Sequence, residues 1–453
     1  MGCSCSPYPC IDISSIFKIN NTNSKNNNSN NKEIISKENE HEIHLLQHTL
    51  KEACSKYGCF HIRIDTSVLS KNNNDKKQHD ILSPLIQNQS IIKNEIETLL
   101  FDQEFIQSIL VDNENCDTTM STVQFQSKDK DSMILNATYR GRSAESGSKK
   151  STLRQGEPKQ SWEFFRCPSS SIIKNGFKLQ NQQDISRIQV LQSFVRALHE
   201  VVVVVCSDIL NLPKNKFICE DEIEDGSKDL LRAFRYDALT STEEQESNLG
   251  SSSHTDWGCM TAVWQDSKGG LQIYCHEHEC WNDVEVDNID SCDDSIVRLF
   301  FHVGDYLSLA MNSTLDENNN VHPRNEGNTK WSSPTHRVLC PLRVCGDNSL
   351  TDSCRCSLVY FAYPPNGISI FDAISSLQAT DLSSQSDNNV SDKCGLINEF
   401  PYHRFMVLNN QSTTASPAND EIDHKQLAKD MFQSVLHQNF DKVIEAKWKQ
   451  VQR

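Results

Sequence analysis

The sequence predicts a mainly β fold with flanking helices, and two observations support this prediction. Between residues 229 and 365, short runs of β-favouring residues alternate with Gly, Asn and Pro, a pattern typical of strands joined by turns in a sandwich or barrel. On both sides of this region, apolar residues recur every three or four positions, as they do in helices that bury one face. With 37% hydrophobic residues, the chain of 453 residues can build such a core.

The N-terminal region, residues 9–212, is expected to be mostly helical. Its predicted elements are, in order, a β-leaning segment at 9–16, a helix at 34–56, a strand at 59–64, a weaker helix at 91–110 and a strong helix at 185–212. Two Asn-rich tracts, 20–32 and 70–77, contain no apolar residue that could be buried. We therefore expect both tracts to be disordered inserts in loops.

The C-terminal half contains the predicted β core, residues 229–366. Strands are expected at 231–236, 261–264, 271–274, 296–303, 306–310 and 357–363. The last region, 395–453, is expected to hold a strand and an amphipathic helix at about 422–447, which closes the chain.

Composition excludes several classes of protein. The chain has 44 Lys and Arg against 61 Asp and Glu, and its net charge of −17 is opposite to that of a general nucleic-acid binder. Its 18 cysteines are scattered, which favours reduced thiols and a cytoplasmic protein over a disulfide scaffold. The longest apolar run, 201–206, is far shorter than the ~20 residues that cross a bilayer. We expect a monomer without a membrane span.

The first eight residues match a lipidation signal. Met-Gly-x-x-x-Ser is the pattern for N-myristoylation, and Gly2 and Ser6 fit it. Cys3 and Cys5 could then accept palmitate, and two acyl chains hold a protein stably at a membrane face. A chance match in a Cys-rich tail is the alternative, because the pattern fixes only two positions after Met1. Membrane contact is expected only through such acylation.

A candidate metal site lies in the β-rich half. Residues two apart in a strand point to the same face, so His254 and Asp256 can converge on one ion. His336 is the candidate third ligand. Two imidazoles and one carboxylate leave three octahedral positions open, which suits a non-haem Fe(II) that binds a co-substrate and O₂. Alone, the His-x-Asp pair is a weak signal, because a strand histidine is often only a satisfied polar residue.

Arg355 and Ser357 form a second candidate pair, at the start of the strand predicted at 357–363. An arginine fork binds a carboxylate through two hydrogen bonds, and a hydroxyl two residues further on points the same way. Such a pair would hold the distal carboxylate of 2-oxoglutarate. A surface ion pair is the alternative for Arg355 taken singly.

In their order along the chain, these residues resemble a known family. The segments concerned are PCIDISS, SKYGCFHI, TYRGRSAESGS, LLRAFRYDA, HTDWGCMTAVWQDSKGGLQIY, FHVGDYLSLAMN, SPTHRVLCP and RCSLVYFAYPP. Together they resemble the isopenicillin N synthase-like family of 2-oxoglutarate- and Fe(II)-dependent dioxygenases over most of residues 9–365.

The resemblance implies a double-stranded β-helix, or jelly-roll, core flanked by helices. It implies that Fe(II) is bound by His254, Asp256 and His336 and that 2-oxoglutarate is held by Arg355, Ser357 and Tyr236. The implied reaction uses O₂ to oxidise a C–H bond of a small organic molecule, most often by hydroxylation, and releases succinate and CO₂. Ascorbate is the expected reductant.

The resemblance also suggests substrate contacts, and the chain departs from the family pattern at two places. The candidate contacts are Tyr139, Arg140, Glu145 and Trp257. Phe234 stands where the family usually has Asn, two residues before the 2-oxoglutarate tyrosine. The segment between His336 and Arg355 is longer than usual.

Three alternatives stay open at this point. An Fe(II) oxidase of the same fold that does not use 2-oxoglutarate could keep the Arg-x-Ser pair. A catalytically silent scaffold tethered to a membrane would explain the acylation signal, although the complete triad argues against it. A zinc site formed by Cys275, His276, His278 and Cys280 is less favoured than a polar hairpin edge, because alternate strand residues face opposite sides.

Overall fold

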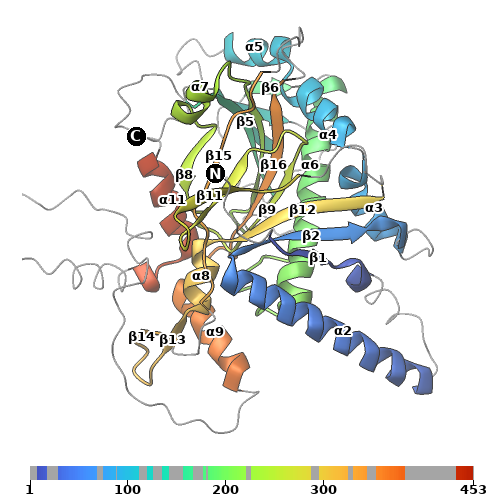
Figure 1. Ribbon diagram of the computed structural model, residues 1–453, viewed down its shortest axis with the longest axis vertical. Coiled ribbons are helices and arrows are strands. Elements are labelled where there is room, and N and C mark those ends of the chain that lie inside the picture. The colour runs from blue at the N-terminus through green and yellow to red at the C-terminus, as the bar shows by residue number, and fades with distance from the viewer. Residues whose placement is uncertain are drawn as a thin grey trace, which may run out of the picture.

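The computed structural model describes residues 8–17, 29–68, 75–87, 89–111, 120–125, 135–141, 157–166, 177–179, 182–220, 226–286, 295–324, 330–343, 353–382 and 435–451. These segments form a ten-stranded sheet, a four-stranded sheet and a two-stranded ribbon, with helices packed around them (Figure 1). The prediction of a mainly β fold with flanking helices is confirmed.

The described part of the chain contains both helices and strands. The helices are α2 (Ser29–Lys56), α3 (Asp75–Ile86), α4 (Gln89–Glu95), α5 (Gln103–Val111), α6 (Gln182–Val203), α7 (Thr242–Ser247), α8 (Asp305–Met311), α9 (Ile370–Leu382) and α11 (Phe440–Val451), with a 3₁₀ turn η1 (Thr66–Val68) and π-helical turns η2 (Ile96–Leu100) and η3 (Val204–Ile209). The strands are β1 (Cys10–Asp12), β2 (Cys59–Asp65), β3 (Met120–Phe125), β4 (Leu135–Arg140), β5 (Lys159–Phe165), β6 (Phe177–Leu179), β7 (Leu230–Tyr236), β8 (Ser251–His254), β9 (Met260–Gln265), β10 (Leu271–Cys275), β11 (Cys280–Asp283), β12 (Ile296–Val303), β13 (Ser313–Leu315), β14 (Val321–Pro323), β15 (His336–Val338) and β16 (Arg355–Ala362).

Eight strands form the predicted jelly roll. In the large sheet the order β12-β9-β16-β7 is antiparallel, and in the small sheet the order β11-β10-β15-β8 is antiparallel as well. Along the chain, β7, β9, β12 and β16 join the large sheet, whereas β8, β10, β11 and β15 join the small one. The chain therefore winds back and forth between two facing sheets as a double-stranded β-helix, which confirms the predicted core.

The N-terminal region contributes strands to the same sheet. β2 pairs with β12 at one side of the core, and β5 pairs with β7 at the other. Strands β3, β4 and β6 continue the sheet beyond β5, although the sequence predicted this region to be mostly helical. Short strands such as these are stabilised by pairing with neighbours, so their own residue pattern is a poor guide to them.

The large sheet has two chemically different faces. Residues paired directly across neighbouring strands point to the same side, so Arg355 lies beside Tyr236, and Ser357 lies beside Phe234. This inner face looks onto the small sheet, and one buried cluster joins the two sheets through Phe234, Tyr236, Val263, Phe300, Leu271, Ile273 and Val338. The outer face packs against α6 over β7, β9 and β16.

Helix α6 is the central helix of the core. The stretch Gln189–Ile209 is long and apolar enough to cross a membrane by length and composition, but 61% of it is buried inside the fold. The large sheet covers one side of this helix, and α3 packs against it as well. The helix predicted at 185–212 is confirmed, and burial keeps its run of valines helical against their preference for strands.

The segment 306–310, predicted to be a strand, is part of helix α8. Gly304 is extended and ends β12, and Asp305 then donates its backbone N–H to the Asp256 carbonyl at 2.7 Å. Six residues of this helix, Asp305 to Ala310, are buried. A short apolar run looks the same in a buried strand and in a buried helix, which explains the error.

The helix predicted at 91–110 is broken into α4, η2 and α5. The break lies at Phe101 and Asp102, where the Asp102 carboxylate accepts a hydrogen bond from the Phe105 backbone N–H at 2.8 Å. This bond caps the N-terminus of α5 and so begins a separate helix.

Two further predictions about the ends of elements are corrected. Helix α2 begins at Ser29 and α3 at Asp75, so residues 29–32 and 75–77 are helical and not disordered. Adding a turn to a helix that is anchored by its buried face costs little. The helix predicted at about 422–447 is interrupted, since α11 begins at Phe440 after Asn439 forms a β-bridge with Ser369; residues 422–434 lie outside the described part of the chain.

Several sequence predictions lie outside the described residues. They concern Glu145, the acylation candidates Gly2, Cys3 and Cys5, and the rest of the two Asn-rich tracts. Residues 395–434 of the C-terminal region also lie outside the described part of the chain.

Candidate metal and co-substrate site

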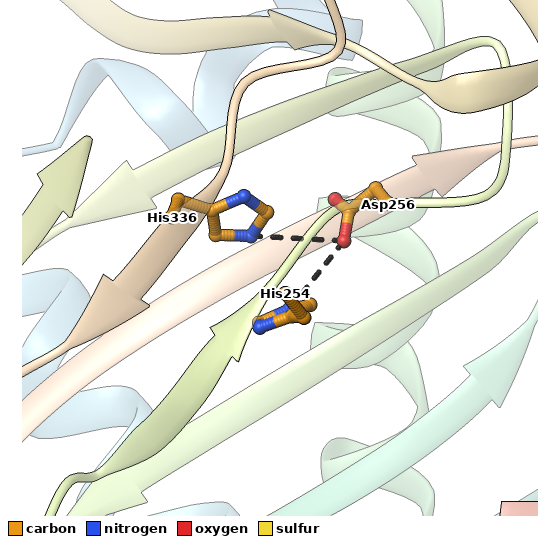
Figure 2. A group of neighbouring side chains, drawn as sticks. All are labelled: His254, Asp256 and His336. Atoms are coloured by element: carbon orange, nitrogen blue, oxygen red, sulfur yellow. Dashed lines mark ion pairs between the residues drawn. The ribbon is translucent and has the colours of Figure 1, made fainter. Parts of the chain in front are cut away.

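The three predicted metal ligands come together between the two sheets. His254 ends β8 and His336 begins β15, and the two residues pair directly across these neighbouring strands. Asp256 follows two residues after His254. Figure 2 shows the three side chains turned toward one another: Asp256 Oδ1 lies 3.6 Å from His254 Nε2 and 3.7 Å from His336 Nε2. The three ligand atoms all lie within 4.8 Å of one another.

Backbone carbonyls orient both imidazoles. The Nδ1 of His254 lies 2.7 Å from the Ser252 carbonyl oxygen, and the Nδ1 of His336 lies 3.2 Å from that of Pro334. Because a carbonyl oxygen can only accept, each Nδ1 carries the proton and donates it. The Nε2 of each ring is then the nitrogen that can offer a lone pair, and it faces Asp256. This is the usual way in which a metal-binding histidine is held.

Asp256 is fixed from its other side. Its Oδ2 accepts a hydrogen bond from the Thr261 hydroxyl at 2.5 Å, and His302 Nε2 lies 3.4 Å from the same oxygen. Burial raises the pKa of the Asp256 carboxyl, but the neighbouring histidines and Thr261 outweigh burial, so the pKa ends below its usual value. His302 is only 1% exposed, and burial lowers its pKa to about 3. The Asp256 carboxylate is therefore ionised, and its Oδ1 is the oxygen available to bind a metal ion.

This donor set fits a non-haem Fe(II) site. Two imidazole nitrogens and one carboxylate oxygen converge, and this set with open positions is typical of Fe(II) oxygenases. Among the described residues it is the one set of three potential ligands that converges in this way. Cys275 and Cys280 pair across the β10–β11 hairpin and the Cys275 thiol lies 3.3 Å from His278 Nδ1, but they do not form such a set.

Arg355, Ser357 and Tyr236 also come together, on the inner face of the large sheet. Arg355 is 1% exposed, and its guanidinium carbon lies 4.7 Å from the centre of the Tyr236 ring. Its Nη1 donates to the Ser357 hydroxyl at 3.2 Å, and its Nη2 donates to Gln265 Oε1 at 3.2 Å. Nε donates to the Gly269 carbonyl. The guanidinium is thus held in one orientation by its neighbours.

The predicted substrate contacts are divided between the two faces. Arg140 points to the inner face, where its Nη2 lies 2.9 Å from Glu163 Oε2. Tyr139 points to the opposite face, where its ring packs on Trp162 in the core beside the helices. Trp257 is partly buried directly after Asp256 in the chain, and Lys447 of α11 lies 4.8 Å from its ring centre.

The sequence predictions did not include His302 and Thr261. The two residues pair across β12 and β9, so they reach Asp256 side by side. His302 belongs to the segment FHVGDYLSLAMN, which resembles the family but in which no residue is predicted to belong to the site. Only the register between β12 and β9 shows that His302 and Thr261 lie side by side, and this register cannot be read from the sequence.

Comparisons with known proteins agree with the chemistry of this donor set. No family model matches the chain. Over 135 residues, which are 30% of this chain and 33% of the relative, it is 29% identical to the 2-oxoglutarate-dependent dioxygenase frbA of Dothideomycetidae sp.. The chain is similar to 2-oxoglutarate-dependent dioxygenases. Over 125 residues, 28% of this chain and 34% of the relative, it is also 25% identical to the 2-oxoglutarate-Fe(II) type oxidoreductase hxnY of Emericella nidulans. The chain spans about a third of the length of these dioxygenase relatives.

Solved structures that hold 2-oxoglutarate are also similar, at low identity. A full-length Neurospora crassa protein in complex with alpha-KG is 15% identical, with 79% of this chain and 86% of that chain covered and a TM-score of 0.44. JOX2 in complex with 2OG, Fe and JA is 14% identical, with 80% and 77% covered and a TM-score of 0.43.

Proposed function

We propose that the chain is an Fe(II)- and 2-oxoglutarate-dependent dioxygenase that oxidises a C–H bond of a small organic substrate. The observation that carries the proposal is the convergence of two anchor points inside one jelly roll. One anchor is the set of His254, Asp256 and His336. The other is the buried guanidinium of Arg355 beside Ser357. An ion and a dicarboxylate are the ligands that these two anchors would bind.

The side chains would divide the work of binding. His254 and His336 would each offer Nε2, and Asp256 would offer Oδ1. The Arg355 fork and the Ser357 hydroxyl would hold the distal carboxylate of 2-oxoglutarate, with the Tyr236 ring packed against the guanidinium. When both are bound, Fe(II) and 2-oxoglutarate supply the oxidising chemistry with O₂, releasing succinate and CO₂ and leaving, in the commonest outcome, a hydroxyl on the substrate.

The neighbouring residues would keep the centre in its productive form. Carbonyl oxygens hold the Nδ1 protons of both ligand histidines, so each Nε2 stays available to the metal. Thr261 holds Oδ2 of Asp256 and thereby favours binding through Oδ1 alone. A carboxylate that binds through one oxygen leaves more positions open for co-substrate and O₂.

An anaerobic titration tests the proposal. Fe(II) and 2-oxoglutarate added together should give a visible charge-transfer band, and the band should be absent in His254→Ala. His276, on the exposed β10–β11 turn, offers a matched control, and His276→Ala should keep the band. Absence of the band in the wild-type chain, or its persistence in His254→Ala, would contradict the proposal.

Product analysis separates the alternatives. Succinate formed in step with substrate oxidation supports the dioxygenase, whereas oxidation without succinate would point to an oxidase of the same fold. A silent scaffold would give neither product nor charge-transfer band. The use of ascorbate, a monomeric state, a cytoplasmic location and tethering through Gly2, Cys3 and Cys5 stay predictions; omission of ascorbate, sizing of the purified chain and mass spectrometry of its N-terminus test them.

A further inference from the structure

Two cysteines lie directly opposite each other at the closed end of the β10–β11 hairpin. Cys275 pairs with Cys280 in the register of this hairpin, and the residues between them, His276 to Glu279, form an exposed turn. Among the strand pairings of the described residues, this is the one that places two cysteines opposite each other. Directly opposite residues point to the same face of a sheet, so the two thiols lie side by side.

The neighbouring pairs of the hairpin show that side chains meet across it. The ring centres of Tyr274 and Trp281, which are directly opposite, lie 5.1 Å apart. Gln272 Nε2 donates to Oδ1 of Asp283, its directly opposite residue, at 2.9 Å. The register therefore brings side chains into contact along the hairpin, and the cysteine pair belongs to the same register.

The backbone spacing of the cysteine pair suits a disulfide. The Leu271 carbonyl accepts from the Val284 N–H at 2.8 Å, so Leu271 directs its backbone groups toward β11. These groups alternate along a strand, so Cys275, four residues further on, forms a hydrogen-bonded pair with Cys280. Cα atoms in such a pair lie about 5.5 Å apart, and disulfides span about 4.4–6.8 Å. Closure would bring the two Cβ atoms closer by about 1 Å.

The pair is accessible, unlike most thiols in the described part of the chain. Of the eleven cysteines described there, eight are buried, whereas Cys275 and Cys280 are partly exposed. Cys10 is exposed as well, but the residue directly opposite it is His61. A thiol reacts with a dissolved oxidant only if the oxidant can reach it. The hairpin thus combines access with a second thiol in the correct place.

A histidine lies beside one of the two thiols. Nδ1 of His278 lies 3.3 Å from the Cys275 sulfur, where it can take the thiol proton. The thiolate is the reactive form of cysteine. Desolvation, followed by the charge of Cys275, raises the pKa of the Cys280 thiol. Cys275 is therefore suited to attack an oxidant first, and Cys280 to react second.

We propose that the β10–β11 hairpin is a redox modification site, at which Cys275 and Cys280 form a reversible disulfide by reaction with a low-molecular-weight disulfide such as glutathione disulfide. The Cys275 thiolate attacks one sulfur of glutathione disulfide, breaks its S–S bond and releases one glutathione. The Cys280 sulfur then attacks Cys275 in this mixed disulfide and releases the second glutathione. Two protein thiols lose two electrons and two protons, and one glutathione disulfide becomes two glutathione thiols.

The site is separate from the proposed metal centre, although it shares strand β10 with the neighbourhood of that centre. Ile273, two residues before Cys275, pairs with His336 on β15. A cross-link at Cys275 would restrain β10 on the edge that faces away from β15. The inference goes beyond the proposed function and does not rest on it, because the thiol exchange uses neither iron nor 2-oxoglutarate. Transient disulfides of this kind occur also in reducing compartments.

Digestion after oxidation tests the inference. The reduced full chain is incubated with glutathione disulfide without O₂, the remaining thiols are blocked, and a Glu-specific protease cleaves the chain. Glu277 and Glu279 lie between the two cysteines, so the protease separates Cys275 from Cys280 unless a disulfide joins the fragments. Mass spectrometry should find joined fragments, which reduction separates. Cys10 should carry only glutathione, because no cysteine lies opposite it.

Four variants test the order of the two steps. Cys280→Ser should trap glutathione on Cys275, whereas Cys275→Ser should add glutathione to Cys280 at least about tenfold more slowly. His278→Gln should slow formation of the disulfide about tenfold, because glutamine cannot take the thiol proton. His276→Gln, on the same exposed turn, is the matched control and should leave the rate unchanged.

Several results would overturn the inference. They are the absence of joined fragments at saturating glutathione disulfide, stable glutathione on both cysteines of the wild-type chain, disulfides from either cysteine to another part of the chain, and an unchanged rate in His278→Gln. Protection of both thiols that a chelator abolishes would assign the pair to a metal ion instead, and this result would also overturn the inference.

Discussion

The two faces of the large sheet are built from the same strands but have different compositions. On β16, Arg355, Ser357 and Val359 face the small sheet, whereas Leu358 and Tyr360 face the helices. The inner face carries the residues proposed to hold 2-oxoglutarate and looks onto the small sheet, whose strands β8 and β15 carry His254 and His336; the outer face is mostly apolar and packs on α6. Because successive residues of a strand face opposite sides of the sheet, a residue proposed to bind a ligand and a residue that packs the core are neighbours in the sequence. Substitutions on the two faces should consequently have different effects.

The largest effect is expected at Asp256. Asp256→Ala removes the charged ligand, so Fe(II) retention should be lost and turnover should fall at least about a thousandfold, equivalent to about 4 kcal/mol. Asp237→Ala, which removes the ion pair with Arg235 and none of the metal ligands, is the control and should retain metal and activity. Metal analysis after gel filtration and succinate formation measure the two effects. Full activity in Asp256→Ala would show that the set of His254, Asp256 and His336 does not hold the metal that drives turnover.

The next effect is expected at Arg355. Arg355→Gln should raise the KM for 2-oxoglutarate by about tenfold to a hundredfold, because it loses charge-assisted hydrogen bonds worth about 1.5–3 kcal/mol. Affinity for Fe(II) should stay unchanged, since none of the three metal ligands is altered. Steady-state kinetics and metal titration distinguish these quantities. A parallel loss of both would indicate that Arg355 acts on the fold and not on the co-substrate.

On the outer face, Leu358→Ala should lower stability and leave chemistry intact. Leu358 is fully buried, and removing such a side chain from a core costs about 2–5 kcal/mol of unfolding free energy. Val359→Ala is the matched control, because the next residue lies on the inner face and is only partly buried. Denaturant unfolding should show a smaller loss for Val359→Ala. Leu358→Ala should keep near-normal KM values at low temperature, because the outer face does not contact the ligands. A raised KM for 2-oxoglutarate would show that the two faces do not differ in this way.

The smallest effect per pH unit is expected from His199 of α6, the helix that packs on the outer face. His199 is buried against Tyr360, whose hydroxyl donates to Asp229, and Arg166 and Glu220 also lie nearby. Burial, together with the charge of Arg166, lowers the pKa of His199 to about 3. The unfolded chain takes up this proton near pH 6.5, so acid favours unfolding between pH 6.5 and about 3.

Stability measured across this window should reveal the contribution of His199. The folded chain should lose up to about 1.4 kcal/mol per pH unit from this residue as the pH falls below 6.5. In His199→Gln the slope of unfolding free energy against pH should be smaller by that amount. An identical slope in both chains would show that His199 titrates alike in the folded and unfolded states.

The sequence predicted the residues of the candidate site better than the elements that surround it. His254 and Asp256 lie two apart, and Arg355 and Ser357 lie two apart, so local spacing alone places each pair on one face. His336 could be named only as a candidate third ligand and Tyr236 only through the family resemblance, because both are distant in sequence from these pairs. These six residues come together in two groups, one of three potential metal ligands and one around Arg355, and their roles stay predictions.

Contacts that depend on strand register could not be predicted. His302 reaches Asp256 because it pairs with Thr261, and Arg232 reaches Glu163 because β7 pairs with β5. No periodicity within one segment specifies which residue of a distant segment lies opposite. Tyr139 shows the same limit, since a shift of one position along β4 places its ring on the helix side and Arg140 on the inner side.

The pairing of β8 with β15 gives the metal ligands a second consequence. His254 and Asp256 belong to one segment and His336 to another. A single ion bound by all three would therefore link β8 and β15, two strands that are far apart in the chain. A ligand that binds only the folded state adds about 2.7 kcal/mol of stability at a hundredfold excess over its dissociation constant. The supply of ferrous iron would then set the lifetime of the folded chain as well as its turnover, and a chain deprived of iron would be the one most readily cleared.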